Sequence, residues 1–83
     1  QNRRAKSFRD KYAQLPKRIK DAAVRAYKMF LQDPSHPSLV WHRLKDNSKG
    51  SHKNGSMAVY VNMQYRAIYY QDGDRNIWYW IGT

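Results

Sequence analysis

The chain has 83 residues, enough for one small domain with little room for a second, and we expect residues 1–83 to form a single domain. Sixteen lysines and arginines against six acidic residues give a formal net charge of +10, and a hydrophobic content of 41% with 14% aromatics is typical of a folded chain. All six acids are aspartates and cysteine is absent. This composition excludes chemistry built on a glutamate base, disulfides and zinc–thiolate sites.

No apolar run approaches the roughly 18 residues that span a bilayer, and no hydrophobic region of a signal peptide is visible. We therefore expect a cytoplasmic protein with no membrane contact. The large positive charge predicts a negatively charged partner. Nucleic acid, an acidic protein and an anionic surface all fit this charge, and a solvated basic surface that serves only solubility is the alternative.

Apolar residues at helical spacing dominate the first part of the chain. Ala5, Phe8, Tyr12 and Leu15 fall on one helix face, and Pro16 then suits the first turn of a second helix that continues to about Gln32. The second helix has an apolar stripe at Ile19, Ala22, Ala23, Ala26 and Phe30, and an opposite cationic face at Lys17, Arg18, Lys20, Arg25 and Lys28. The two segments predict an αα-hairpin with a very short turn.

The pattern changes beyond Asp33-Pro34-Ser35-His36-Pro37, where two prolines disfavour helix. Strands are predicted at Leu39–Lys45, Met57–Asn62, Tyr65–Gln71 and Asn76–Ile81, with a loop at Asp46–Ser56 and a turn at Asp72-Gly73-Asp74. The predicted fold class is α+β: an N-terminal helical hairpin packed on an antiparallel sheet of three or four strands. We expect Phe8, Tyr12, Leu15, Ile19, Ala23, Ala26 and Phe30 to face the sheet, above Val59 and Val61.

Both faces of the last predicted strand are apolar. Strict alternation places Ile77, Tyr79 and Ile81 on one face and Trp78 and Trp80 on the other. Because both faces cannot pack on the same helices, one of them is expected to meet a partner, solvent or substrate.

Few residues have the spacing of a catalytic or metal site. His36, His42 and His52 have no spacing that brings them together, so we expect no metal site and no cofactor, and His36 is interpreted as a loop residue. Aromatics on the last strands surround Arg66, a combination that stacks bases and holds phosphates, although a small domain also fills its core with such side chains. The preceding loop adds Lys45, Lys49, His52 and Lys53, which suit a phosphate-bearing ligand or are simply solvated.

Several strings occur together in an order that resembles the RelE/ParE superfamily of bacterial toxins. They are Tyr12…Leu15-Pro16…Ile19, Asp33-Pro34-Ser35-His36-Pro37-Ser38-Leu39, Leu44-Lys45, Val59-Tyr60-Val61, Tyr65-Arg66-Ala67-Ile68-Tyr69 and Trp78-Tyr79-Trp80-Ile81-Gly82. The resemblance covers nearly the whole chain. It implies the toxin half of a type II toxin–antitoxin module, with the same helical hairpin on an antiparallel sheet.

The resemblance also implies an activity, a partner and site residues. RelE-like members cleave mRNA on the ribosome without a metal, whereas ParE-like members inhibit DNA gyrase. The first reading makes Arg66 the residue that stabilises the phosphate and His42 or His52 the base. Lys45, Lys49, Lys53, Tyr60 and Trp80 are then RNA-binding candidates. An acidic antitoxin protein is the implied partner in a toxin–antitoxin hetero-oligomer.

Two departures keep a non-catalytic alternative open. Relatives often have an arginine in the strand where this chain has Tyr60, and many continue past Trp-Ile-Gly into a segment whose His and Tyr supply catalytic groups, whereas this sequence stops at Thr83. The sequence also starts with Gln1, so it is interpreted as a possible fragment. The leading hypothesis is therefore a ribosome-dependent endoribonuclease, and the alternative is a toxin that inhibits by binding gyrase or RNA, or an inactive relative that binds antitoxin.

Overall fold

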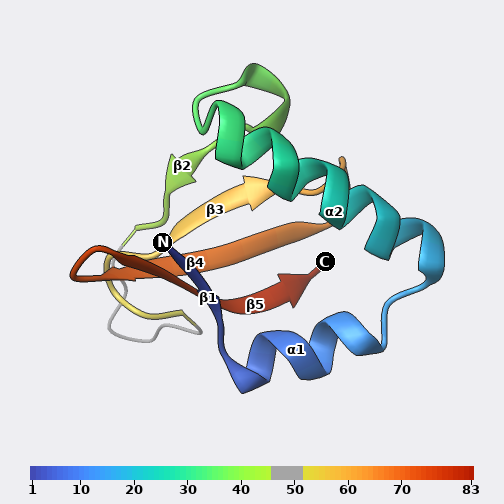
Figure 1. The fold of residues 1–83 in the computed structure, drawn as a ribbon, viewed down its shortest axis with the longest axis horizontal. Helices are drawn as coiled ribbons and strands as arrows, with labels where there is room; N and C mark the ends of the chain where they lie inside the picture. The colour runs from blue at the N-terminus through green and yellow to red at the C-terminus, as the bar shows by residue number, and fades with distance from the viewer. Residues whose placement is uncertain (46–51) are drawn as a thin grey trace.

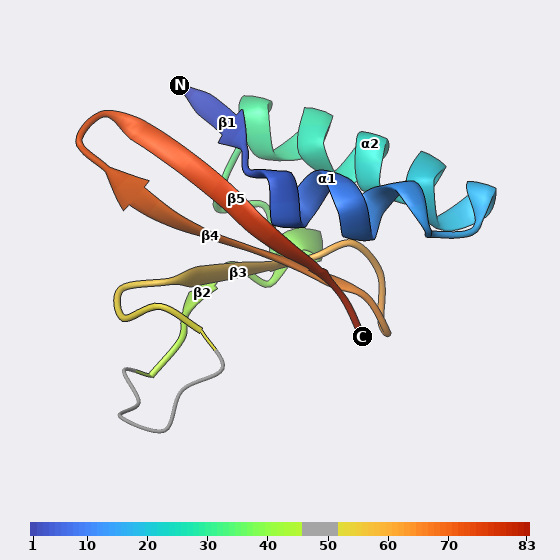
Figure 2. The same cartoon turned by 90° about the horizontal axis from the view of Figure 1, so that it is seen from below.

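The computed structural model describes residues 1–45 and 52–83, and in them two helices pack on one face of a single sheet (Figures 1 and 2). The elements are β1 (Asn2–Arg4), α1 (Lys6–Ala13), α2 (Lys17–Gln32), a 3₁₀ helix (Pro37–Leu39), β2 (His42–Arg43), β3 (Met57–Tyr60), β4 (Arg66–Asp72) and β5 (Arg75–Gly82). The strand order is β1-β5-β4-β3-β2. The predicted α+β class, with its N-terminal helical hairpin on the sheet, is confirmed.

The sheet differs from the prediction because it is mixed and five-stranded within the described residues. β2, β3, β4 and β5 pair antiparallel in sequence, but β1 adds a parallel strand to the outer side of β5. The Oδ1 of Asn2 accepts hydrogen bonds from the Trp78 Nε1, at 2.9 Å, and from the Asn76 Nδ2, at 3.1 Å. The first strand was missed because a polar segment of three residues has no alternation to reveal it.

The helical hairpin follows the predicted boundaries closely. Pro16, with φ of −57°, precedes the first residue of α2, and Asp33 ends it in an extended conformation before Pro34. The core between the layers contains the predicted Phe8, Phe30 and Val59, and Tyr12, Leu15, Ala23, Ala26 and Val61 pack against it. Ile19 is buried as well. The predicted phase of both helices is therefore confirmed.

The predicted strand at Leu39–Lys45 is mostly wrong. Leu39 ends the 3₁₀ helix and is buried, Val40 adopts a left-handed conformation with φ of 45°, and only His42 and Arg43 pair with β3. A β-branched residue rarely takes positive φ, so local sequence could not indicate this bend. β3 also ends at Tyr60, because the Asn62 Oδ1 accepts from the backbone N–H groups of Gln64 and Tyr65 and forms a turn.

A β-bulge overturns the expected alternation along β5. Tyr69 pairs with Trp78 while its neighbour Ile68 pairs with Trp80, so Tyr79 has no partner of its own on β4. Trp78 and Ile81 therefore both lie in the core, although strict alternation places them on opposite faces. The bulge leaves Tyr79 and Trp80 together on the sheet face that the helices do not cover.

Candidate nucleic-acid interface

The sheet face turned away from the helices presents aromatic and cationic side chains. Ala67 and Tyr69 of β4 are buried against the helices, so the alternate residues of the same strand point the other way. We call this surface the open face, and it comprises Tyr60, Arg66, Ile68, Tyr70, Tyr79 and Trp80. All six are half-buried, with their side chains accessible from solvent.

Arg66 and Tyr60 form a stacked pair on the open face. They are directly paired residues of β4 and β3, and the guanidinium carbon lies 4.5 Å from the centre of the tyrosine ring. The Arg66 Nη2 also donates to the Tyr60 Oη at 3.0 Å. No carboxylate among residues 1–45 and 52–83 forms an ion pair with Arg66, so its charge is not neutralised within that part of the chain. The pair is a positioned cation suited to a phosphate.

Trp80 lies on the other side of Arg66. Gly82 pairs with Arg66 across β4 and β5, and a Cβ placed on Gly82 would come within 3.0 Å of the Trp80 ring. Glycine therefore lets the indole lie against the strand next to the arginine. The Nζ of Lys11, from α1, lies 5.8 Å from the centre of the same ring. Both predicted aromatic contacts, Tyr60 and Trp80, thus flank the predicted arginine.

The loop that leads into β3 brings one predicted lysine to the open face. The Nζ of Lys53 lies 5.3 Å from the ring centre of Tyr70. His52 donates from Nε2 to the Lys45 carbonyl oxygen at 2.7 Å, which closes the loop at its base. Lys45 is exposed, and Lys49 falls outside the described residues. Of the two predicted loop lysines in the part of the chain that the structure describes, Lys45 and Lys53, the ammonium of Lys53 contacts this face.

The histidines are not gathered around Arg66. His42 pairs with Ala58 on the side of the open face, and its Nδ1 donates to the Val40 carbonyl oxygen at 2.8 Å. Two strand spacings and two residues separate its Cα from that of Arg66, roughly 12 Å. The Nδ1 of His36 accepts from the Ser38 backbone N–H at 3.1 Å, so this histidine caps the 3₁₀ helix, in agreement with its interpretation as a loop residue.

Residues 1–45 and 52–83 contain neither a candidate metal site nor a candidate membrane-spanning helix. No three residues of the types histidine, cysteine, aspartate and glutamate come together in a way that would hold a metal ion. No helix there is both long and apolar enough to cross a membrane.

A second surface lies between the two helices. A cavity of about 470 Å³ opens between α1 and α2, with a floor that includes Ala67 and Trp78 and a polar end at Asn2 and Arg4. Beside it, α2 exposes an apolar stripe of Val24, Tyr27 and Leu31, of which 43%, 41% and 56% is exposed. This stripe was not predicted, although its spacing of three and four residues is visible in the sequence, because the outer surface of α2 was expected to be cationic throughout.

Comparison with known proteins places the fold. No protein-family model matches the chain, and neither does any curated protein sequence. Among solved structures, the chain is similar to YafQ from Escherichia coli strain BL21(DE3), with a TM-score of 0.77 and 14% identity over 100% of this chain and 91% of that one. It is also similar to the toxin–antitoxin complex RelBE2 from Mycobacterium tuberculosis, with a TM-score of 0.72 and 20% identity over 98% and 93% of the two chains.

A third similar structure is the YoeB/ParE toxin from Agrobacterium tumefaciens, with a TM-score of 0.72 and 14% identity over 99% of this chain and 95% of that chain. These proteins are RelE-like toxins. The resemblance found in the sequence strings is confirmed at the level of three-dimensional structure, because the likeness extends over the whole helical hairpin and sheet. The chain has the α+β fold of RelE-like toxins.

Proposed function

We propose that this protein is the toxin of a type II toxin–antitoxin module and that it cleaves mRNA on the ribosome by metal-independent chemistry. The observation that carries the proposal is the Arg66 guanidinium, held on the open face against Tyr60 with no ion-pair partner among the described residues. The likeness in fold to YafQ and RelBE2 supports the toxin class. The net charge of +10 supports a polyanionic substrate.

The proposed reaction uses the RNA itself as the nucleophile. A base removes the proton of a 2′-hydroxyl, and the oxygen attacks the adjacent phosphorus. The bond from phosphorus to the 5′-oxygen then breaks, and that oxygen takes up a proton. Negative charge builds on the phosphate oxygens in the transition state, where Arg66 would offset it. Tyr60 and Trp80 would stack on the neighbouring bases, and Lys45, Lys49 and Lys53 would hold phosphates.

His42 and His52 are the proposed bases. Each donates one ring N–H to a backbone carbonyl oxygen, Val40 for His42 and Lys45 for His52. When the ring is neutral, the other nitrogen carries a lone pair that accepts a proton, which is the arrangement a general base needs. The carbonyl bond fixes the tautomer in each case.

The test is primer-extension mapping of mRNA in a translating extract. The parent protein is expected to produce cleavage sites, and Arg66→Ala to cut about 10²–10³-fold more slowly. Arg18→Ala is the matched control because it removes the same charge from an exposed position on α2. Circular dichroism of each variant separates a loss of activity from a loss of folding. Equal rates for Arg66→Ala and Arg18→Ala would refute the assignment of Arg66.

A non-catalytic toxin is the second candidate, and one observation favours it. No histidine of residues 1–45 and 52–83 forms a hydrogen bond or ring contact with Arg66, whose guanidinium contacts Tyr60. Such a protein would act by binding gyrase or RNA without cleaving RNA. Growth arrest without any mRNA cleavage, together with inhibition of gyrase supercoiling in vitro, would select this function.

The antitoxin is proposed to cover the cavity between α1 and α2. The apolar stripe of Val24, Tyr27 and Leu31 borders that cavity, and Lys20 and Lys28 lie along the same side of α2 without an ion pair to any described carboxylate. An acidic amphipathic helix would match both features, because its apolar side would enter the cavity and its acidic edges would meet the lysines. The complex formed in this way would be a hetero-oligomer.

A further inference from the structure

Lys53 is held at three points, by Ser56 three residues along the chain and by Tyr70 and Tyr79 from the sheet. Its backbone N–H donates to the Tyr79 Oη at 3.1 Å, and its carbonyl oxygen accepts from the Ser56 Oγ at 2.6 Å. Its ammonium group lies 5.3 Å from the ring centre of Tyr70. A lysine in a loop ordinarily keeps its rotamer freedom in solution, whereas this one has its main chain and its charge positioned together.

Tyr79 and Ser56 close this arrangement through their hydroxyl groups. The two oxygens lie 2.6 Å apart, and Ser56 is completely buried. Ser56 donates to the Lys53 carbonyl, so the shared hydrogen between the two hydroxyls belongs to Tyr79. Tyr79 therefore accepts from the Lys53 N–H and donates to Ser56, and the three residues form a closed ring of hydrogen bonds. We call Tyr79 and Ser56 the hydroxyl clamp.

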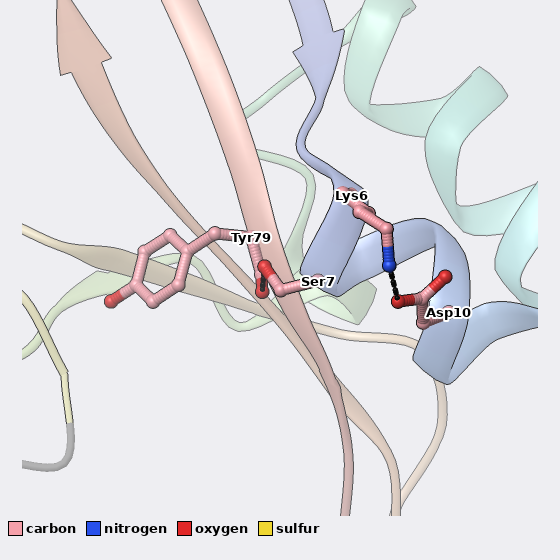
Figure 3. A network of polar contacts seen from close by, with 4 residues as sticks. All are labelled: Lys6, Ser7, Asp10 and Tyr79. Atoms are coloured by element: carbon pink, nitrogen blue, oxygen red, sulfur yellow. Dashed lines mark hydrogen bonds and ion pairs between the residues drawn. The ribbon is translucent and has the colours of Figure 1, made fainter.

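The bulge in β5 makes the hydroxyl clamp possible. Tyr79 has no partner on β4, and its backbone oxygen accepts from the Ser7 Oγ of α1 at 2.7 Å. Figure 3 shows the Tyr79 ring extending from β5 to the side opposite Ser7 and α1. The ring lies 5.7 Å from Tyr70, centre to centre. One residue thus connects the helical layer, the bulged strand and the loop that contains Lys53.

We propose that Tyr79 and Ser56 are positioning residues that hold Lys53 as a phosphate-contacting cation on the open face. The inference rests on the proposed function, because it assumes that RNA binds this face. The hydrogen bonds that Ser56 and Tyr79 make with the Lys53 main chain do not by themselves require a cation at this position. The placement of the Lys53 ammonium over Tyr70, on the face that also contains Arg66, gives the clamp its role. Holding the lysine in advance lowers the ordering cost of each phosphate contact.

The test measures the affinity of a fluorescein-labelled 2′-O-methyl RNA oligonucleotide by anisotropy at several salt concentrations. This probe has no free 2′-hydroxyl, so binding is measured without cleavage. Lys53→Met should weaken binding about tenfold, as the loss of one charge-assisted contact. It should also reduce the slope of log affinity against log salt by about 0.7, the value for one phosphate on a single strand. Lys28→Met, which removes a charge from α2, is the matched control and should change both quantities less.

The clamp is tested by Tyr79→Phe and Ser56→Ala, which remove one hydroxyl each and no charge. Each should weaken binding about two- to tenfold. In a Lys53→Met background each should have no further effect, because a positioning residue acts only through the group that it holds. Tyr27→Phe, on the exposed side of α2, is the matched tyrosine control. A purely structural role would instead lower affinity equally in both backgrounds, and that result would overturn the proposal.

Different experimental results would refute the role of Lys53 and the proposed function. If the parent binds the oligonucleotide and Arg66→Ala weakens binding while Lys53→Met behaves as Lys28→Met, RNA binds the open face without Lys53 and the inference is refuted. If the parent does not bind RNA and inhibits gyrase, the proposed function and the inference both fail. Lys53→Arg gives the converse check, because it should retain most of the affinity that Lys53→Met loses.

Discussion

The indole of Trp41 donates from Nε1 to the Oη of Tyr69 at 2.8 Å, joining the segment before β2 to the centre of β4. Tyr69 is buried, with its ring packed against Phe30 and Trp78 at 5.5 and 4.5 Å between centres. Burial raises the pKa of Tyr69 above its ordinary value of 10.0, and the bond from Trp41 opposes this shift only in part. The neutral phenol is therefore favoured by the folded state.

This raised pKa predicts a loss of stability in alkali. The contribution of Tyr69 is fully present below the unfolded pKa of about 10 and is lost as pH rises through the higher folded pKa, because the unfolded chain then releases the proton more readily. Melting temperatures measured by circular dichroism from neutral pH to strongly alkaline pH should fall less steeply for Tyr69→Phe than for the parent. Tyr12→Phe is the matched control. Parallel curves for the parent and Tyr69→Phe would contradict the prediction.

Phe30 packs α2 against the sheet in the core between the two layers. It is 5% exposed and packs edge-to-face against Trp78 at 5.2 Å between ring centres. Phe30→Ala should lower the free energy of unfolding by about 3–5 kcal/mol, a large part of what a domain of this size has. Urea denaturation measures the change. Its neighbour Leu31 is 56% exposed, so Leu31→Ala should be nearly neutral, and a similar loss in both variants would show that the phase of α2 is wrong.

Asn2 ties the first strand to the last. Asn2→Ala leaves the Nε1 of the buried Trp78 without its acceptor. This change should lower the free energy of unfolding by about 1–3 kcal/mol. Hydrogen exchange should also accelerate at the Ala5 and Asn76 amides, which bond the Trp78 and Gln1 carbonyls across this junction. Arg3→Ala keeps those bonds and serves as the control. Unchanged protection at both amides in Asn2→Ala would mean that β1 is held by its backbone alone.

In the proposed antitoxin surface, the charged residues are expected to govern the association rate and the apolar residues the dissociation rate. For the acidic amphipathic partner proposed above, the association rate should fall by about tenfold or more between low and physiological ionic strength. Val24→Ser should leave that rate nearly unchanged and raise the dissociation rate, because apolar anchors govern lifetime. Met63→Ser is the matched control, since Met63 is 86% exposed and does not line the cavity. Stopped-flow or surface-binding kinetics would measure both rates, and an association rate indifferent to salt would refute the electrostatic part.

The helices and the central strands were predictable because their signals are local. The spacing of Phe8, Tyr12 and Leu15 and the position of Pro16 identify the hairpin, and Gly73, with φ of 63°, provides the predicted turn between β4 and β5. Arg66 was identified from the Tyr-Arg string, and its place on the open face follows from alternation with the buried Ala67 and Tyr69. Each of these features depends on residues a few positions apart.

The remaining features depend on residues that meet only after folding. Asn2 holds β1 to Trp78 across 76 positions of sequence, and Tyr79 meets Lys53 across 26. The bulge that brings Tyr79 and Trp80 to one face is a property of the pairing between β4 and β5, so alternation within β5 alone gave the wrong assignment. Sequence periodicity reports which side of an element is apolar. Which hydroxyl, amide or cation lies opposite is decided by strand register and layer packing, because hydrogen bonds between distant residues leave no periodic trace in the chain.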